Sequence, residues 1–108
     1  MTKIELFSED LRDLSTFFKV LSHPARMTIL RYLADTGTCI SGDISKELPL
    51  SRTTVQQHLA ELKNTGFIKG EIKGVRNNYC LNPENIRRIK QQIDQFLDDL
   101  GDTNNEIC

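Results

Sequence analysis

Apolar residues recur at intervals of three or four positions near both ends of the chain. The stripe of the N-terminal stretch is Phe7, Leu11, Leu14, Phe18 and Leu21. The stripe of the C-terminal stretch is Ile86, Ile89, Ile93, Phe96 and Leu100. This spacing predicts two amphipathic helices, each with one apolar face. Ser8 provides an N-cap for the first helix, and Pro83 suits the first turn of the second.

Between these two helices the pattern changes at short intervals and predicts smaller elements. The expected elements are helices over 24–36, 41–48 and 51–65, a short strand over 38–40, and hairpin strands over 67–73 and 75–81. Gly37, Pro49 and Gly66 are suited to ending the three helices. The predicted fold is mainly α with a small β-hairpin, in the order α-α-(β)-α-α-β-β-α. We expect one domain over 1–108, with residues 1–7 and 101–108 flexible.

The charge is balanced overall but unevenly distributed. The chain has 14 Lys and Arg against 15 Asp and Glu, a net charge of −1. This balance excludes a uniformly basic nucleic-acid binder, although one positive face is enough for specific binding. Between 49 and 80 the only acids are Glu61 and Glu71, and the basic residues are Arg52, Lys63, Lys69, Lys73 and Arg76. The distribution favours a DNA-facing centre, with the ends directed away from DNA.

The helices over 41–48 and 51–65 match a helix-turn-helix, and the hairpin after them matches a wing. On the second helix Val55 and Leu59 face inward, which leaves a polar outer face. Gln pairs with adenine, Arg with guanine, and Thr with either base or a thymine methyl group. Basic residues beside Gly74, at the hairpin tip, suit phosphates or the minor groove. The predicted DNA-binding residues are Ser51, Arg52, Thr53, Thr54, Gln56, Gln57, Lys63, Lys73 and Arg76.

Two other classes of function fit the sequence less well. A winged helix used only for protein contacts is the main alternative, but such modules usually lack the polar outer face and the basic wing. An enzyme is not expected, because the chain has no phosphate-binding Gly loop and no Cys-x-x-Cys motif. The salt dependence of binding distinguishes the two hypotheses, because the affinity of a DNA-binding protein falls steeply with salt and that of a protein-binding module falls far less.

The histidines are interpreted as structural. A metal or catalytic role for His58 would need partner ligands, and none lies at helical spacing from it. His58 lies towards the buried edge of its helix and is expected to make a structural hydrogen bond, with a DNA contact as the alternative. His23 precedes Pro24 and is expected to act as a cap or turn residue. Arg26 is expected to form a structural ion pair.

The N-terminal segment and the cysteines indicate the compartment. The start MTKIELFSED lacks the apolar core of a secretory signal, and no apolar run reaches the length of a membrane span. Three cysteines without such a signal favour the cytoplasm and free thiols. We therefore expect a cytoplasmic protein with no membrane partner.

Three segments carry a resemblance to a known family. FFKVLSHPARMTILRYL, SGDISKELPLSRTTVQQHLAELKNTGFIKG and GVRNNYCLNPEN resemble the ArsR/SmtB family of bacterial repressors over about residues 14–86. The resemblance implies a homodimeric winged helix that represses its own operon and is released by a metal, a metalloid or another thiol-directed signal. It also implies a dimer interface on the terminal helices, here Leu11, Leu14, Phe18, Ile89, Ile93, Phe96, Leu97 and Leu100. The alternative is that these side chains only complete the core of their own chain.

The signal that the resemblance implies depends on the cysteines. Arsenic- and cadmium-sensing members carry Cys-x-Cys, whereas this chain has Cys39-Ile40-Ser41. The last helix has no His, so a zinc site there is not expected. Cys39 and Cys80 lie on strands that pair in a winged helix, and we hypothesise a thiol pair that oxidises or binds trivalent arsenic or another thiophilic ion. Cys108 is a candidate third ligand. The alternative is that Cys39 and Cys80 are small buried hydrophobes.

Overall fold

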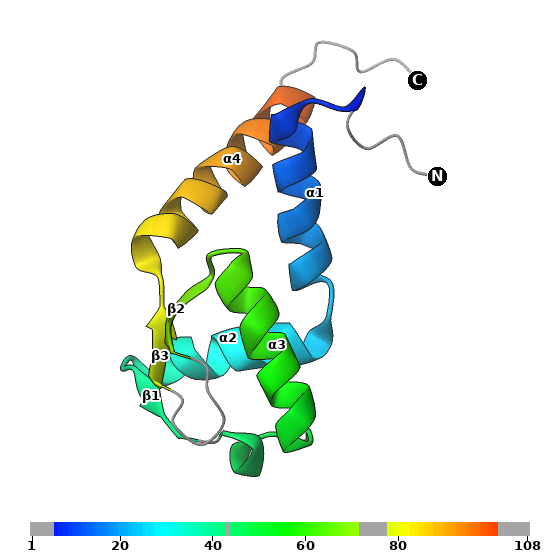
Figure 1. Ribbon diagram of the computed structural model, residues 1–108. Coiled ribbons are helices and arrows are strands. Elements are labelled where there is room, and N and C mark those ends of the chain that lie inside the picture. Colours follow the sequence, from blue (N-terminus) through cyan, green and yellow to red (C-terminus); the bar gives the residue numbers. More distant parts are fainter. Residues whose placement is uncertain (1–5, 43, 72–77, 102–108) are drawn as a thin grey trace.

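The structure is a computed structural model that describes residues 6–42, 44–71 and 78–101. Within these ranges it contains four α-helices, a short 3-10 helix and three strands (Figure 1). In chain order they are α1 (Glu9–Leu21), α2 (Pro24–Thr36), β1 (Ile40–Ser41), η2 (Ser45–Glu47), α3 (Arg52–Asn64), β2 (Ile68–Glu71), β3 (Asn78–Leu81) and α4 (Pro83–Gly101). This order confirms the predicted winged-helix fold class.

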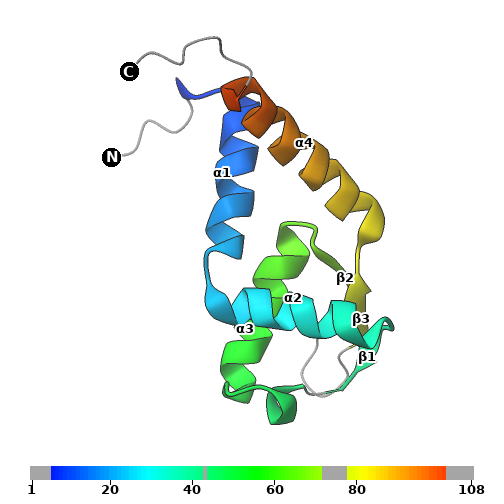
Figure 2. The same ribbon diagram turned by 180° about the vertical axis from the view of Figure 1, so that it is seen from behind.

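The elements form two regions, which we call the body and the arms. The body consists of α2, α3 and the sheet, and the arms are α1 and α4 (Figure 1). Both views place the start of α1 beside the end of α4, and the two helices spread apart towards the body (Figures 1 and 2). The start of α3 and η2 lie at the opposite end of the molecule.

The sheet is antiparallel throughout, with the strand order β1-β3-β2. Tyr79 on the central strand pairs with Ile40 on one side and with Gly70 on the other. Tyr79 is fully buried, so this row of residues faces the core. Gly70 has φ +122°, and a Cβ there would lie 2.1 Å from the backbone oxygen of Asn78. Only glycine fits this position without displacing the central strand.

Local capping explains where the helices begin and end. Ser8 Oγ accepts a hydrogen bond from the Leu11 amide at 3.3 Å, and His23 Nδ1 accepts one from the Ala25 amide at 3.2 Å. Gly37 ends α2 in the left-handed region at φ 69°, with its amide bonded to the Leu33 carbonyl. These contacts confirm the predicted limits of the first two helices, including the role of His23 as a cap.

The third predicted helix is much shorter in the structure. Only Ser45–Glu47 are helical, in one 3-10 turn, and Ser41 is not a cap, because it pairs with Asn78 in the sheet. Gly42 has φ +87°, which breaks a helical path directly after β1. Leu48 is extended, as the residue before a proline prefers. Gly101, at the edge of the C-terminal segment expected to be flexible, is the last residue of α4.

One core connects the body to both arms. Its buried residues are Val20, Ile29, Leu33, Ile44, Val55, Leu59, Leu62, Phe67, Ile68, Tyr79 and Ile89. The ring of Phe17 on α1 meets the ring of Phe67 edge-on, with centroids 6.3 Å apart. Asn85 at the start of α4 donates a 2.9 Å hydrogen bond from Nδ2 to the Gly66 carbonyl, just after α3. The base of each arm is therefore fixed to the body.

Candidate nucleic-acid interface

Helix α3 presents one apolar side and one polar side, as the sequence predicts. Val55, Leu59 and Leu62 are at most 1% exposed and hold the helix against the body. The spacing of four and three residues places them on one stripe. The polar side of α3 therefore faces away from the body. The start of α3 lies at the end of the molecule opposite to the start of α1 and the end of α4 (Figure 1).

The predicted base-reading side chains lie on this outward side. Arg52, Thr53 and Gln57 are exposed, and Gln56 is half-buried. Lys63 is exposed near the end of the helix, about three turns from Arg52. The structure therefore brings the predicted base readers together at the start of α3 and separates Lys63 from them.

Ser51 and Thr54 are hydrogen-bonded to each other and together form the N-terminal cap of α3. Ser51 Oγ accepts a hydrogen bond from the Thr54 amide at 3.2 Å and donates one to Thr54 Oγ1 at 2.8 Å. Thr54 is half-buried and Ser51 is exposed. The cap fixes the first turn of α3, where backbone amides and the helix dipole favour an anion such as phosphate.

Of the predicted wing, the structure describes the paired strands β2 and β3. Strands β2 and β3 pair over four residues, from Ile68 with Leu81 to Glu71 with Asn78. Lys69 is exposed on β2. The predicted wing contacts Lys73 and Arg76 lie outside the described residues.

A contact between α2 and α3 holds the buried edge of α3, the helix predicted to read DNA and here called the recognition helix. Arg26 Nε donates a 3.0 Å hydrogen bond to His58 Nδ1, and the His23 and His58 rings pack 4.4 Å apart. His58 is only 7% exposed. Burial, with smaller contributions from His23 and Arg26, lowers the pKa of His58 below its usual value. The structural role of His58 is confirmed, and the partner of Arg26 is this imidazole rather than the predicted acid.

Cys39 and Cys80 are joined by a disulfide, with their Cα atoms 4.3 Å apart. The cross-strand placement is as predicted, because the β1–β3 register, continued by one residue beyond Ile40 and Tyr79, puts Cys39 opposite Cys80. The expectation of free thiols is wrong for this pair. Cys39 is exposed and Cys80 half-buried, so the alternative of two buried hydrophobes is also wrong. Cys108 lies outside the described residues.

The predicted interface residues on the arms differ in exposure. Leu14 and Ile89 are buried within the chain, at 7% and 4% exposure, and Ile93 and Phe96 are half-buried. The exposed members are Leu11, Phe18, Leu97 and Leu100, between 42% and 58%. A groove of about 500 Å³ lies between the two arms, with Leu11 and Phe96 in its wall.

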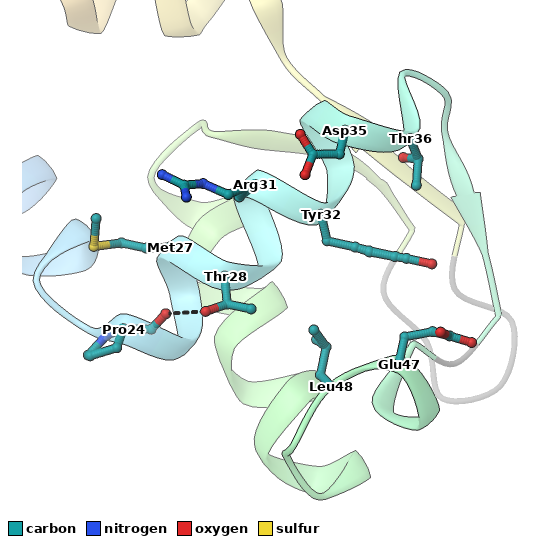
Figure 3. Close-up of a pocket in the computed structure, with 9 residues that line it drawn as sticks. All are labelled: Pro24, Met27, Thr28, Arg31, Tyr32, Asp35, Thr36, Glu47 and Leu48. Atoms are coloured by element: carbon teal, nitrogen blue, oxygen red, sulfur yellow. Dashed lines mark hydrogen bonds between the residues drawn. The ribbon is translucent and has the colours of Figure 1, made fainter.

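A second hollow, of about 720 Å³, lies between α2 and η2 (Figure 3). Its charged lining residues, Arg31, Asp35 and Glu47, are all exposed, so it is an open surface depression. No group of three or more metal-ligating side chains occurs among the described residues. The described helices also include none that is long and apolar enough to cross a membrane.

Comparisons with known proteins identify this architecture. A family model described as bacterial regulatory protein, arsR family, matches residues 23–69. The arsenical resistance operon repressor of Staphylococcus xylosus is 31% identical over 83 residues, which cover 77% of this chain and 79% of the repressor. The chain belongs to the ArsR family. It is therefore a DNA-binding transcriptional regulator, as predicted.

Two further similarities agree with membership of the ArsR family. An uncharacterised HTH-type transcriptional regulator of Methanocaldococcus jannaschii is 30% identical over 79 residues, 73% of this chain and 89% of that protein. A solved ArsR-like transcriptional regulator from Rhodococcus sp. RHA1 has a TM-score of 0.71 at 20% identity, covering 87% of this chain and 88% of the other. At that identity the likeness concerns the fold, and the match covers most of both chains.

Proposed function

We propose that this ArsR-family regulator is a cytoplasmic homodimeric repressor that binds an operator upstream of its own gene. The observation that supports this most is the exposed polar side of α3, anchored from behind by Val55, Leu59 and Leu62. A rigid helix with outward Arg, Thr and Gln residues matches direct readout in the major groove.

Each predicted contact has a distinct part in this proposal. Arg52, Gln56 and Gln57 read base edges, and Thr53 contacts a base or a methyl group. The remaining residues position the protein on the sugar-phosphate backbone; they are Ser51, Thr54, Lys63, Lys73 and Arg76. Base contacts determine sequence preference, whereas the phosphate contacts determine salt dependence.

Fluorescence anisotropy with the upstream DNA tests the DNA proposal. Affinity is expected to fall steeply with salt, with a log–log slope of about −0.9 for each phosphate neutralised. Gln57→Ala should relax sequence preference, whereas Gln91→Ala, an exposed glutamine on α4, should not. Binding that is insensitive to salt and to Gln57→Ala would favour a protein-interaction module instead.

The dimer proposal is supported by the apolar side chains left open on the arms. Leu11, Phe18, Leu97 and Leu100 are each at least 42% exposed, and all four lie on α1 or α4. Phe18→Asp should convert the dimer to monomer in analytical ultracentrifugation, because a charge cannot be buried unpaired without a large cost. Met27→Asp is the matched control, since Met27 is 53% exposed on α2. Equal effects of both variants would place the interface elsewhere.

The release signal is proposed to be thiol-directed. The S. xylosus relative is an arsenical resistance repressor, and this chain carries Cys39 and Cys80 within bonding distance. In the reduced state, trivalent arsenic or another thiophilic ion is expected to bind the two thiolates, with Cys108 as the candidate third ligand. Arsenic should release operator DNA from the protein in a non-thiol reductant, and Cys39→Ser should abolish that response. Release from the Cys39→Ser variant would exclude the pair as the sensing site.

A further inference from the structure

Three residues that the DNA interface does not use form a row across the outer face of the sheet. Cys39 lies opposite Cys80, to which it is bonded, and Lys69 on β2 lies opposite Cys80 from the other side. Residues directly opposite each other in antiparallel strands point to the same face. The row is therefore Cys39–Cys80–Lys69, with the half-buried Cys80 in the middle.

The neighbouring row shows which face this is. Ile40, Tyr79 and Gly70 are each one residue away on the same three strands, and the fully buried Tyr79 marks the core face. Side chains alternate between faces along a strand, so the cysteine row faces solvent. The exposure of Cys39 and Lys69 agrees with this assignment.

This placement differs from that of a structural disulfide. A small-molecule thiol or disulfide has access to Cys39, because that residue is exposed. An ammonium group beside a cysteine favours the thiolate, which is the nucleophilic form. The 4.3 Å separation of the Cα atoms is close to the spacing of about 4.5 Å in a non-hydrogen-bonded antiparallel pair. The bond therefore fits the ordinary spacing of paired strands, so it can form between β1 and β3 without displacing either strand.

We propose that Cys39 and Cys80 form a reversible thiol–disulfide exchange site, for which low-molecular-weight disulfides are the oxidants, and that its oxidation state sets operator affinity. The Cys39 thiolate attacks one sulfur of the disulfide, which breaks the S–S bond and releases one thiolate. The Cys80 thiolate then attacks Cys39 Sγ in the mixed disulfide, closes the intramolecular bond and releases the second thiolate. The two protons lost by the cysteines pass to the two released thiolates, so two thiols are oxidised and one disulfide is reduced.

The coupling to DNA follows from the position of the bond in the chain, and this part rests on the proposed repressor function. Cys39 precedes β1 and the helix-turn-helix, whereas Cys80 lies on the strand that returns from the wing. Every predicted DNA contact, from Ser51 to Arg76, lies in the loop that the bond closes. Without the bond, β1 pairs with β3 over only Ile40 and Ser41, a very short ladder. The oxidised form is therefore the more preorganised one, and preorganisation increases affinity.

The exchange chemistry can be tested without DNA. The full chain is used with the substitution Cys108→Ser, so that Cys39 and Cys80 are its only cysteines. It is equilibrated with mixtures of reduced and oxidised glutathione. Alkylation and mass spectrometry should show one reversible transition between dithiol and internal disulfide. Lys69→Gln should slow closure about threefold, whereas Lys19→Gln, at another exposed lysine, should not. Accumulation of glutathione adducts without an internal disulfide would overturn the proposal.

The coupling is tested by anisotropy with the upstream operator on fully oxidised and fully reduced protein. The oxidised form should bind at least about threefold more tightly, and Cys39→Ser should remove the dependence on redox state. Equal affinities, or tighter binding by the reduced form, would overturn the coupling while leaving the repressor function intact. Absence of binding by both forms would overturn the repressor function itself, and the glutathione experiment would still decide the exchange chemistry.

Discussion

The body and the arms bury their apolar side chains to very different extents. On α3, in the body, Leu59 and Leu62 are fully buried. On α4, in the arms, Leu97 and Leu100 remain 53% and 58% exposed. Both helices have a regular apolar stripe, so the difference arises from what each stripe faces. The core of the body is enclosed by α2, α3 and the sheet, whereas the two arms lie side by side at the start of α1 and the end of α4 and spread apart towards the body (Figures 1 and 2).

This difference indicates two sources of stability. The body closes its core within one chain, so its contribution should not depend on protein concentration. The exposed apolar side chains of the arms are uncovered within one chain, and in the proposed homodimer a second copy would cover them with the same pattern. Substitutions in the two regions should therefore differ in size and in concentration dependence.

The largest expected effect is in the body. Leu59→Ala should lower the free energy of unfolding by about 3 kcal/mol, because it removes buried methyl groups and leaves a cavity. Urea denaturation followed by circular dichroism measures this loss. A loss below about 1 kcal/mol would mean that the body core collapses around the cavity or is less closed than the structure shows.

Leu97→Ala tests whether the stability contributed by the arms depends on protein concentration. At low protein concentration its effect should be small, within about 0.5 kcal/mol, as for an ordinary surface substitution. At high concentration the effect should grow, because dimerisation stabilises the folded state by mass action. Urea midpoints at two well-separated protein concentrations test this. A concentration-independent loss would assign Leu97 to the core of its own chain.

The helix caps give a matched pair of tests, one in the body and one in the arms. Ser51→Ala removes the cap of α3 and should cost about 1 kcal/mol of unfolding free energy. Ser8→Ala removes the equivalent cap of α1, whose first turn is exposed, and should cost less because that turn packs against little. Thermal unfolding at fixed concentration compares the two. Only Ser51→Ala should also weaken DNA binding, since Ser51 lies at the proposed interface.

The smallest expected effect is a pH dependence at the α2–α3 contact. The pKa of His58 is lowered in the folded protein, so the unfolded chain binds more protons at mildly acidic pH. The contribution of His58 is therefore complete above its unfolded pKa of about 6.5 and is lost as the pH falls through the lower folded value. The urea midpoint should fall between pH 7.5 and 5.5, and His58→Gln should reduce that fall. An unchanged slope in the variant would exclude His58 as the cause.

The sequence predicted the parts of the fold that short-range chemistry determines. Ser8, Gly37 and Ser51 mark helix limits through contacts within one turn, and the apolar stripe of α3 identifies its buried side. These features need only neighbouring residues, so periodicity and capping preferences were sufficient to find them. The outward position of Arg52 and Gln57 follows directly from that stripe.

Long-range pairing explains most of what the sequence did not show. Ser41 looked like a helix cap, but its backbone is held by Asn78 in the sheet. The bond from Arg26 to His58 joins residues that are 32 positions apart, and no local pattern signals it. Cys39 and Cys80 are the exception, because the strand order of a winged helix predicts that they lie opposite each other.

The hydrogen bond between Asn85 and Gly66 makes the start of α4 a point about which the helix can tilt. It fixes the first turn of α4 at the point where α3 has just ended, while the far end of α4 extends away from the body (Figure 1). With 19 residues, the helix is about 28 Å long, so a tilt of about 10° at this pivot moves its far end by about 5 Å. In a dimer joined through the arms, a rotation at each pivot changes the separation of the two recognition helices. In the proposed dimer the spacing of these helices along DNA would therefore depend on a contact at Asn85, which lies at the opposite end of α3 from the predicted base contacts.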